Sequence, residues 1–211
     1  MQEYVLKDEL VDGVKPTEQG WLWPAEDNGV WDGPKENWPQ FKSYIQENVR
    51  GKKVVVQAGG ACGMYPFLLS HMFETVYTFE PSFINFHCLV HNTPKQRIVK
   101  FNAALGLTHE MVEVVYADKS NVGTNTVKMH EEAFVPTLLI DDLDLAACDF
   151  IQLDIEGYEY NAIMGAQFTI KKFKPLISLE NGHTQDLRIL MESMGYILDK
   201  EIHADSFWKP L

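Results

Sequence analysis

The sequence predicts an α/β fold with a doubly wound, mostly parallel sheet, helices on both of its faces, and an N-terminal arm. Two patterns indicate this. From residue 52 onward, short apolar runs alternate with segments of helical periodicity. The apolar runs are nearly continuous, as expected for strands buried on both faces of a parallel sheet. The chain of 211 residues, 45% of them hydrophobic, is long enough for one domain with a full core.

Residues 1–40 differ in composition from the rest of the chain. Four of the five tryptophans (Trp21, Trp23, Trp31 and Trp38) lie there together with four prolines. Turn residues with large apolar anchors predict an irregular arm whose tryptophans fold back onto the body. A lid or a substrate-side wall is the alternative. We therefore expect an arm or lid at 1–40 and a single α/β domain at 41–211.

The elements of the domain follow in order. A helix at 37–50 has its apolar side chains on one face, with Asn37 as its N-cap and Pro39 in its first turn. Apolar runs predict strands at 53–58, 75–80, 97–104, 149–154, 176–180, 196–202 and 206–209, with weaker candidates at 111–117 and 126–130. Helical spacing predicts helices at 65–73, 83–92, 158–167 and 184–194, and a connector or short helix at 138–145.

Charge and composition argue against several classes of partner. The net charge of −12 disfavours nucleic acid, since phosphates require clustered basic residues. No apolar run is long enough to span a membrane. The N-terminus lacks the pattern of a signal peptide, so cytoplasmic residence is the expectation. Three widely spaced cysteines match neither a disulfide framework nor a zinc site. Oligomeric state has no readable signal.

A glycine-rich turn follows the first predicted strand of the domain. Gly59, Gly60 and Gly63 lie there, where glycines allow a ligand to approach the backbone near a helix N-terminus. The next strand ends in Glu80, and an acid at that position is the usual partner of ribose hydroxyls. Loop and acid together favour an adenosine-type cofactor. The glycine spacing departs from the dinucleotide fingerprint, and S-adenosylmethionine, a cation without phosphate, fits an acidic protein better.

A later apolar strand runs directly into three carboxylates, Asp154, Glu156 and Glu159. Ligands of open α/β sheets bind at the carboxyl ends of strands. Asp154 and Glu156 are therefore candidates for a base or an orienting group, with Glu180 and His183 at the neighbouring strand end as alternates. Glu159 is expected to stabilise the start of the next helix. A divalent metal on Asp154, Glu180 and His183 is an alternative, but a metal-free site is favoured.

Six segments, in order, resemble the motifs of FkbM-type methyltransferases. They are VVVQAGGACGMY at 54–65, TFEPSFINF at 78–86, NAALG at 102–106, LIDDL at 139–143, DFIQLDIEGYE within 149–166, and PLISLE at 175–180. The resemblance covers about residues 50–182. It implies a Rossmann-like class I methyltransferase domain, S-adenosylmethionine as cofactor, and a hydroxyl acceptor on a small molecule or glycan.

The resemblance also implies roles for individual residues. Asn102 and Ala103 fall where the family places adenine, and Asp154 falls near the reacting methyl group. Gln57 replaces the usual aspartate of the first strand, and Ala61 replaces the usual asparagine. Gln57 can hydrogen-bond the methionine amine but supplies no charge. The expected cofactor contacts are Gln57, Gly59, Gly60, Ala61, Gly63, Glu80, Pro81, Asn102, Ala103 and Asp154.

The residues therefore favour an S-adenosylmethionine-dependent O-methyltransferase. The alternative is a catalytically weakened or non-catalytic cofactor-binding or scaffold protein of the same fold, because of the changes at Gln57 and Ala61. The glycine spacing disfavours a nicotinamide-dependent oxidoreductase. The acidic charge and the absence of an Asn-Pro-Pro-aromatic motif disfavour a nucleic-acid methyltransferase.

Overall fold

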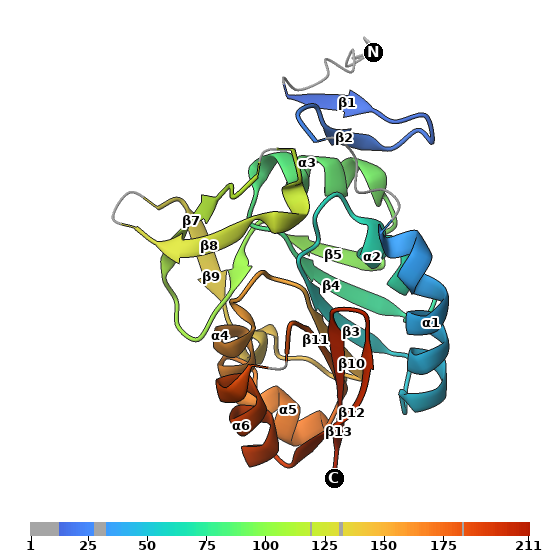
Figure 1. Ribbon diagram of the computed structural model, residues 1–211, viewed down its shortest axis with the longest axis vertical. Helices are drawn as coiled ribbons and strands as arrows, with labels where there is room; N and C mark the ends of the chain where they lie inside the picture. The colour runs from blue at the N-terminus through green and yellow to red at the C-terminus, as the bar shows by residue number, and fades with distance from the viewer. Residues whose placement is uncertain (1–12, 28–32, 119, 131–132, 183) are drawn as a thin grey trace, which may run out of the picture.

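A seven-stranded mixed sheet forms the centre of the molecule, with strand order β12-β13-β11-β10-β3-β4-β5 (Figure 1). The computed structural model describes residues 13–27, 33–118, 120–130, 133–182 and 184–211. The parallel strands are β3 (Val54–Ala58), β4 (Thr75–Phe79), β5 (Ile98–Phe101), β10 (Phe150–Leu153) and β11 (Leu176–Glu180). β13 (Asp205–Pro210) pairs antiparallel with both β11 and β12 (Tyr196–Ile202). The last strand of the chain therefore lies between two earlier ones.

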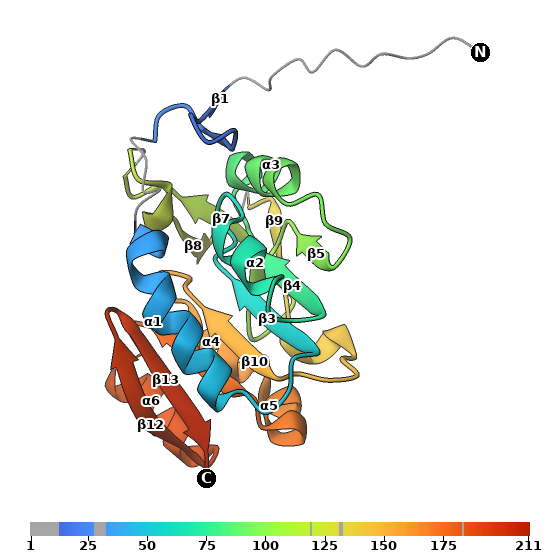
Figure 2. The same cartoon turned by 90° about the vertical axis from the view of Figure 1, so that its right-hand side faces the viewer.

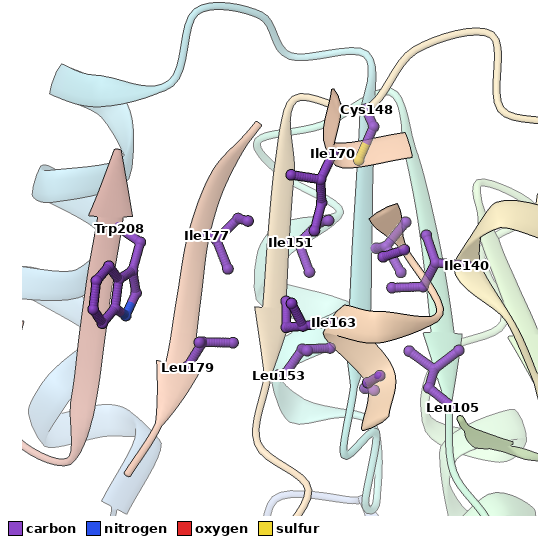
Figure 3. Close-up of a cluster of buried hydrophobic side chains, with 14 of the residues drawn as sticks. Leu105, Ile140, Cys148, Ile151, Leu153, Ile163, Ile170, Ile177, Leu179 and Trp208 are labelled. Atoms are coloured by element: carbon purple, nitrogen blue, oxygen red, sulfur yellow. The ribbon is translucent and has the colours of Figure 1, made fainter. Parts of the chain in front are cut away.

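Helices cover both faces of this sheet (Figure 2). They are α1 (Gly33–Asn48), α2 (Met64–Leu69), α3 (Phe83–Asn92), α4 (Glu159–Met164), α5 (Gln167–Phe173) and α6 (Gln185–Ser193). Side chains alternate along a strand, so neighbouring residues enter different cores. Phe150 packs with Phe41 of α1 on one face, whereas Ile151 joins Ile163 of α4 on the other (Figure 3).

A small second sheet stands beside the carboxyl ends of the main strands (Figure 1). Its strands are β6 (Ala104–Leu105), β7 (Met111–Val115), β8 (Thr126–Met129) and β9 (Val135–Leu138). β7 and β8, the two weaker strand candidates, pair antiparallel, and the 3₁₀ turn η1 (Val122–Thr124) precedes β8. The strand expected at 97–104 is divided between β5 and β6, so one sequence run serves two sheets.

The N-terminal segment is anchored to the body. The hairpin of β1 (Val14–Pro16) and β2 (Leu22–Pro24) lies on α3. Asn92 of α3 accepts a hydrogen bond from the Leu22 N–H at 2.7 Å and donates to the Leu22 carbonyl oxygen at 2.8 Å. Trp21 packs edge-on against Phe67, while Trp31 lies outside the described residues. The expected arm boundary at residue 40 falls inside α1.

Two helix predictions are wrong in detail. The helix expected at 37–50 begins at Gly33, so Asn37 is not its N-cap and Pro39 lies inside it. The helix expected at 158–167 ends early, at Met164 (α4), because the chain is interrupted near Gly165, and a helix that the sequence analysis does not predict, α5, follows from Gln167. A Cβ on Gly165 would lie 2.0 Å from the carbonyl oxygen of Gly106, so the two backbones touch there. Among the described residues, no helix is long and apolar enough to cross a membrane.

Asp141, in the 3₁₀ turn η2 (Ile140–Leu143), caps α5 from outside that helix. Its carboxylate oxygens accept hydrogen bonds from the Phe168 and Thr169 N–H groups at 3.0 and 2.7 Å. We expect Asp141→Ala to lower the free energy of unfolding by about 1–2 kcal/mol, because both amides lose their acceptor. Asp142→Ala, which removes only an exposed contact with His109, should cost less than about 1 kcal/mol. Urea denaturation measures both, and equal losses would contradict the capping role.

Candidate functional site

A pocket of about 320 Å³ opens at the carboxyl ends of β3, β4 and β10. Small-molecule sites typically occupy about 300–1,000 Å³. Apolar walls come from Phe79, Ala103 and Leu105, and carboxylates come from both sides of β3. Glu80 follows β4 on one side, while a group of acids follows β10 and β11 on the other. Within the described part of the chain, no lysine, arginine or histidine lines this pocket.

The predicted glycine loop forms the floor between these two sides. The N–H groups of Gly59 and Gly60 both donate to the Phe79 carbonyl oxygen, at 3.2 and 2.9 Å. Gly59 has a left-handed φ of 81°, and a Cβ there would lie 1.8 Å from the Asp154 carbonyl oxygen. A Cβ on Gly63 would meet the Thr93 side chain at 2.8 Å. Packing within the protein therefore accounts for these glycines, and Gly63 lies outside the pocket lining.

Glu80 links the loop to the next helix from a buried position. Its side chain is 4% exposed. One carboxylate oxygen accepts from the Ala61 N–H at 2.7 Å, and the other accepts from the Ser82 N–H at 2.8 Å. Burial raises the pKa of Glu80 to about 7, and these hydrogen bonds oppose the rise. Pro81 lines the pocket beside it. Glu80 thus holds the glycine loop in place while facing the pocket.

Besides Gly63, two further expected cofactor contacts, Gln57 and Asn102, lie outside the pocket lining. Gln57 is fully buried, and its amide donates to the carbonyl oxygens of Ala58 and Gly59, both at 3.0 Å. Asn102 donates to the carbonyl oxygens of Glu80 and Pro81 at 2.9 and 3.1 Å. Both amides are engaged by backbone, so these side chains shape the loop and the strand tip.

The structure brings three of the predicted catalytic carboxylates together. One oxygen from each of Asp154, Glu156 and Glu180 lies within 4.8 Å of the others, and we call these residues the carboxylate cluster. Glu156 and Gly157 both have left-handed φ angles, 53° and 95°, where the chain turns after β10. The Thr126 hydroxyl, from the small sheet, donates to the Glu156 carbonyl oxygen at 3.0 Å and anchors this turn. His183 lies outside the described residues.

Burial and mutual repulsion shift the acids of this region toward their protonated forms. Burial, and then Glu180, raises the pKa of Asp154 well above its usual range. Burial, and then the charges of Glu180 and Glu159, raises the pKa of Glu156 to about 7. Asp205, opposite Glu180 on β13, has a pKa raised to about 6 by burial and by Glu180. The region therefore favours protons or a cation at neutral pH.

Glu159 has the structural role that the sequence predicts. It is the first residue of α4, and its carboxylate accepts a hydrogen bond from the Ile155 N–H at 3.0 Å.

Several lining residues were not predicted from the sequence. Tyr65 of α2 lines the pocket, and burial followed by the charges of Asp205, Asp154 and Glu180 raises its pKa. Asn125, just before β8, also lines it, and both of its amide atoms are buried without a hydrogen-bond partner. Trp23 reaches the pocket from the N-terminal hairpin. Tyr65 ends the motif segment at 54–65 but carries no role in it, whereas Asn125 and Trp23 lie in no motif and are brought to the site by the tertiary fold.

Comparisons with known proteins give the family and the fold of the chain. Residues 62–198 match the family model described as "Methyltransferase FkbM domain". A crystal structure of a methyltransferase FkbM from Methylobacillus flagellatus KT is similar in fold, with 21% identity, a TM-score of 0.52, and coverage of 79% of this chain. This chain spans 50% of that one. A precorrin 8W decarboxylase of Methanobacterium thermoautotrophicum aligns with 8% identity, a TM-score of 0.50, and 82% and 90% coverage of the two chains. No curated protein matches the sequence.

The raised pKa of Asp205 predicts a specific dependence of stability on pH. Its proton is held more tightly in the folded chain than in the unfolded one, so its contribution to stability is lost as pH rises from about 4 to about 6. We expect wild type to lose about 1–3 kcal/mol more unfolding free energy across this window than Asp205→Asn, which retains an acceptor for Ser178. Urea denaturation at pH 4.5 and 7 tests this, with exposed Asp144→Asn as control. Parallel pH profiles for wild type and Asp205→Asn would refute it.

Proposed function

The chain belongs to the FkbM methyltransferase family, and from this premise we propose that it transfers a methyl group from S-adenosylmethionine to a hydroxyl of a small molecule or glycan. The observation that carries the proposal is the division of one pocket into two chemically different sides. Glu80 and apolar walls lie on one side of β3, and the carboxylate cluster lies on the other. Such a pocket suits a ligand with a nucleoside part and a cationic part.

The residues present fit this cofactor. S-adenosylmethionine, when bound, supplies a methyl group on a positively charged sulfur. Glu80, at the tip of the second parallel strand, would accept hydrogen bonds from ribose hydroxyls. Phe79, Ala103 and Leu105 offer an apolar surface for adenine. The carboxylates beyond β3 would attract the cationic part.

The same cluster supplies a means of activating a hydroxyl acceptor. Efficient general bases have pKa values close to the working pH, and Glu156, with a pKa of about 7, meets this condition. Asp154 lies within hydrogen-bonding reach of Glu180, and burial and Glu180 raise its pKa well above its usual range. We assign Glu156 the removal of the acceptor proton and Asp154 the orientation of the acceptor oxygen. Glu180 keeps Asp154 in place.

One observation favours the alternative of a weakened or non-catalytic protein. Gln57 carries no charge, and its amide hydrogens are bound to loop carbonyl oxygens. The first strand therefore offers no anionic contact of its own. In this second proposal the fold keeps the pocket but binds the cofactor poorly.

Calorimetry with S-adenosylhomocysteine separates the two proposals. We expect wild type to bind, and Glu80→Ala to bind about 10–100-fold more weakly, because hydrogen bonds to a buried carboxylate are lost. Glu74→Gln, an exposed acid just before β4, is the matched control. Absence of both heat and thermal shift for wild type at millimolar ligand would support the weakened protein instead. A crystal soaked with the same ligand would show whether Glu80 meets the ribose.

A further inference from the structure

We infer that the carboxylate cluster of Asp154, Glu156 and Glu180 binds a hard divalent cation of the Mg²⁺, Mn²⁺ or Ca²⁺ class. One oxygen from each residue lies within 4.8 Å of the others. Oxygen ligands lie about 2.0–2.6 Å from such ions, so opposite ligands are separated by about 4–5 Å. An all-oxygen, all-carboxylate set selects these ions over zinc or copper. The described residues thus place three ligands in one coordination sphere.

The charge balance of the pocket also calls for a cation. Asp205 lies next to Glu180 in the β11–β13 register and adds a fourth acid to the region. The described pocket lining contains no basic side chain. The three cluster residues are half-buried, and carboxylates this close together without a countercharge repel one another. A divalent ion in contact with three of them offsets this repulsion more fully than a monovalent ligand does.

A second, independent observation lies directly beneath the cluster. Gln152 of β10 is 0% exposed, and neither its amide nitrogen nor its amide oxygen has a hydrogen-bond partner. The Asp154 N–H bonds to the Ala58 carbonyl oxygen at 3.1 Å, so Asp154 continues the β10 ladder. Gln152 and Asp154 therefore lie on the same face of the sheet, one above the other.

The neighbours of Gln152 below and beside it on the sheet are apolar or already hydrogen-bonded. Phe150 lies below it on the same face, within the apolar core. On either side, its partners in the strand register are Gln57 and Ser178. Gln57 is bound to its own loop, and the Ser178 hydroxyl donates to Asp205 at 3.0 Å. These groups are engaged elsewhere, whereas Asp154 of the cluster lies two residues further along the same face.

A hydrated ion would satisfy these groups together. One carboxylate oxygen of Glu180, Oε2, is also buried without a partner. Buried polar groups are rarely left unpaired. Mg²⁺ and Ca²⁺ retain water ligands alongside carboxylates, so the ion would take up the Glu180 oxygen and a coordinated water would bond the Gln152 amide.

The role of this ion rests on the proposed function. A divalent cation at this place would bind the acceptor hydroxyl and lower its pKa, so that Glu156, which would give the ion one carboxylate oxygen, could take the proton on the other. Since the ion has further open positions, it favours an acceptor with two neighbouring oxygen atoms, such as a vicinal diol or a hydroxy acid. This narrows the acceptor class.

Titration of the full-length, EDTA-treated chain with Mn²⁺ alone, followed by calorimetry or electron paramagnetic resonance, tests the site. We expect about one saturable ion per chain, and binding at least about tenfold weaker in Glu180→Gln, which removes one charged ligand. Glu74→Gln should bind like wild type. An anomalous-scattering peak between Asp154, Glu156 and Glu180 in Mn²⁺-soaked crystals would support the assignment.

Binding of S-adenosylhomocysteine provides the separate readout. If Glu180→Gln unfolds cooperatively at a temperature close to that of wild type, the variant is folded and its loss of Mn²⁺ is local. Absence of saturable binding of Mn²⁺, Mg²⁺ and Ca²⁺ to wild type, or equal binding by Glu180→Gln, would overturn the inference and leave the proposed function intact. Mn²⁺ binding without S-adenosylhomocysteine binding would count against the proposed function alone.

Discussion

The close approach of Gly59 to the backbone of Asp154 is the constraint on which the site depends. A Cβ on Gly59 would lie 1.8 Å from the Asp154 carbonyl oxygen, so only glycine allows the ends of β3 and β10 to stay paired. The Asp154 N–H bonds to the Ala58 carbonyl oxygen just before this contact. Because the pairing continues past the end of each strand, the loop after β3 and the acids after β10 share one pocket. If the ends of β3 and β10 lay further apart, the loop and the acids would not line the same pocket.

Glu80 is the second residue on which the site depends, because its carboxylate both holds the loop and lines the pocket. Its bonds to the Ala61 and Ser82 N–H groups hold the loop and the start of α3 without any ligand. A buried carboxylate that faces a pocket has a raised pKa, and Glu80 has a pKa of about 7. The loop is therefore organised before a ligand arrives, which lowers the entropy lost on binding.

The sequence predicts the parts of this fold that depend on local pattern. Continuous apolar runs locate the five parallel strands, and the position of Glu159 after β10 predicts its place at the start of α4. A sequence pattern does not show which partner a polar side chain bonds. The sequence therefore predicts that Gln57 contacts a cofactor, whereas in the structure its amide donates to carbonyl oxygens of the loop. The break near Gly165 depends on contact with Gly106, which is distant in sequence.

The strand order explains why Asp205 is missing from the site residues that the sequence predicts. Asp205 belongs to the site because β13 inserts between β11 and β12 and pairs it with Glu180. The sequence does not predict this strand order, since a hairpin with β12 next to β11 and β13 at the edge would have the same sequence pattern. Residues that join a site through strand order are therefore the ones that sequence reasoning loses.

The face of the main sheet that packs against α1 has an apolar half and a polar half. Val55 and Phe150 lie in the dry core, whereas two residues further along each strand Gln57 and Gln152 are buried and polar. A sheet optimised for stability alone would continue the apolar pattern, because buried polar groups with imperfect partners are unfavourable. The polar half lies directly below Asp154, at the end of the sheet where the pocket opens. The buried polar residues at this end of the sheet therefore lower the stability of the fold, but they lie next to the carboxylate cluster. Such a local loss of stability is typical of functional sites, and here it coincides with the pocket.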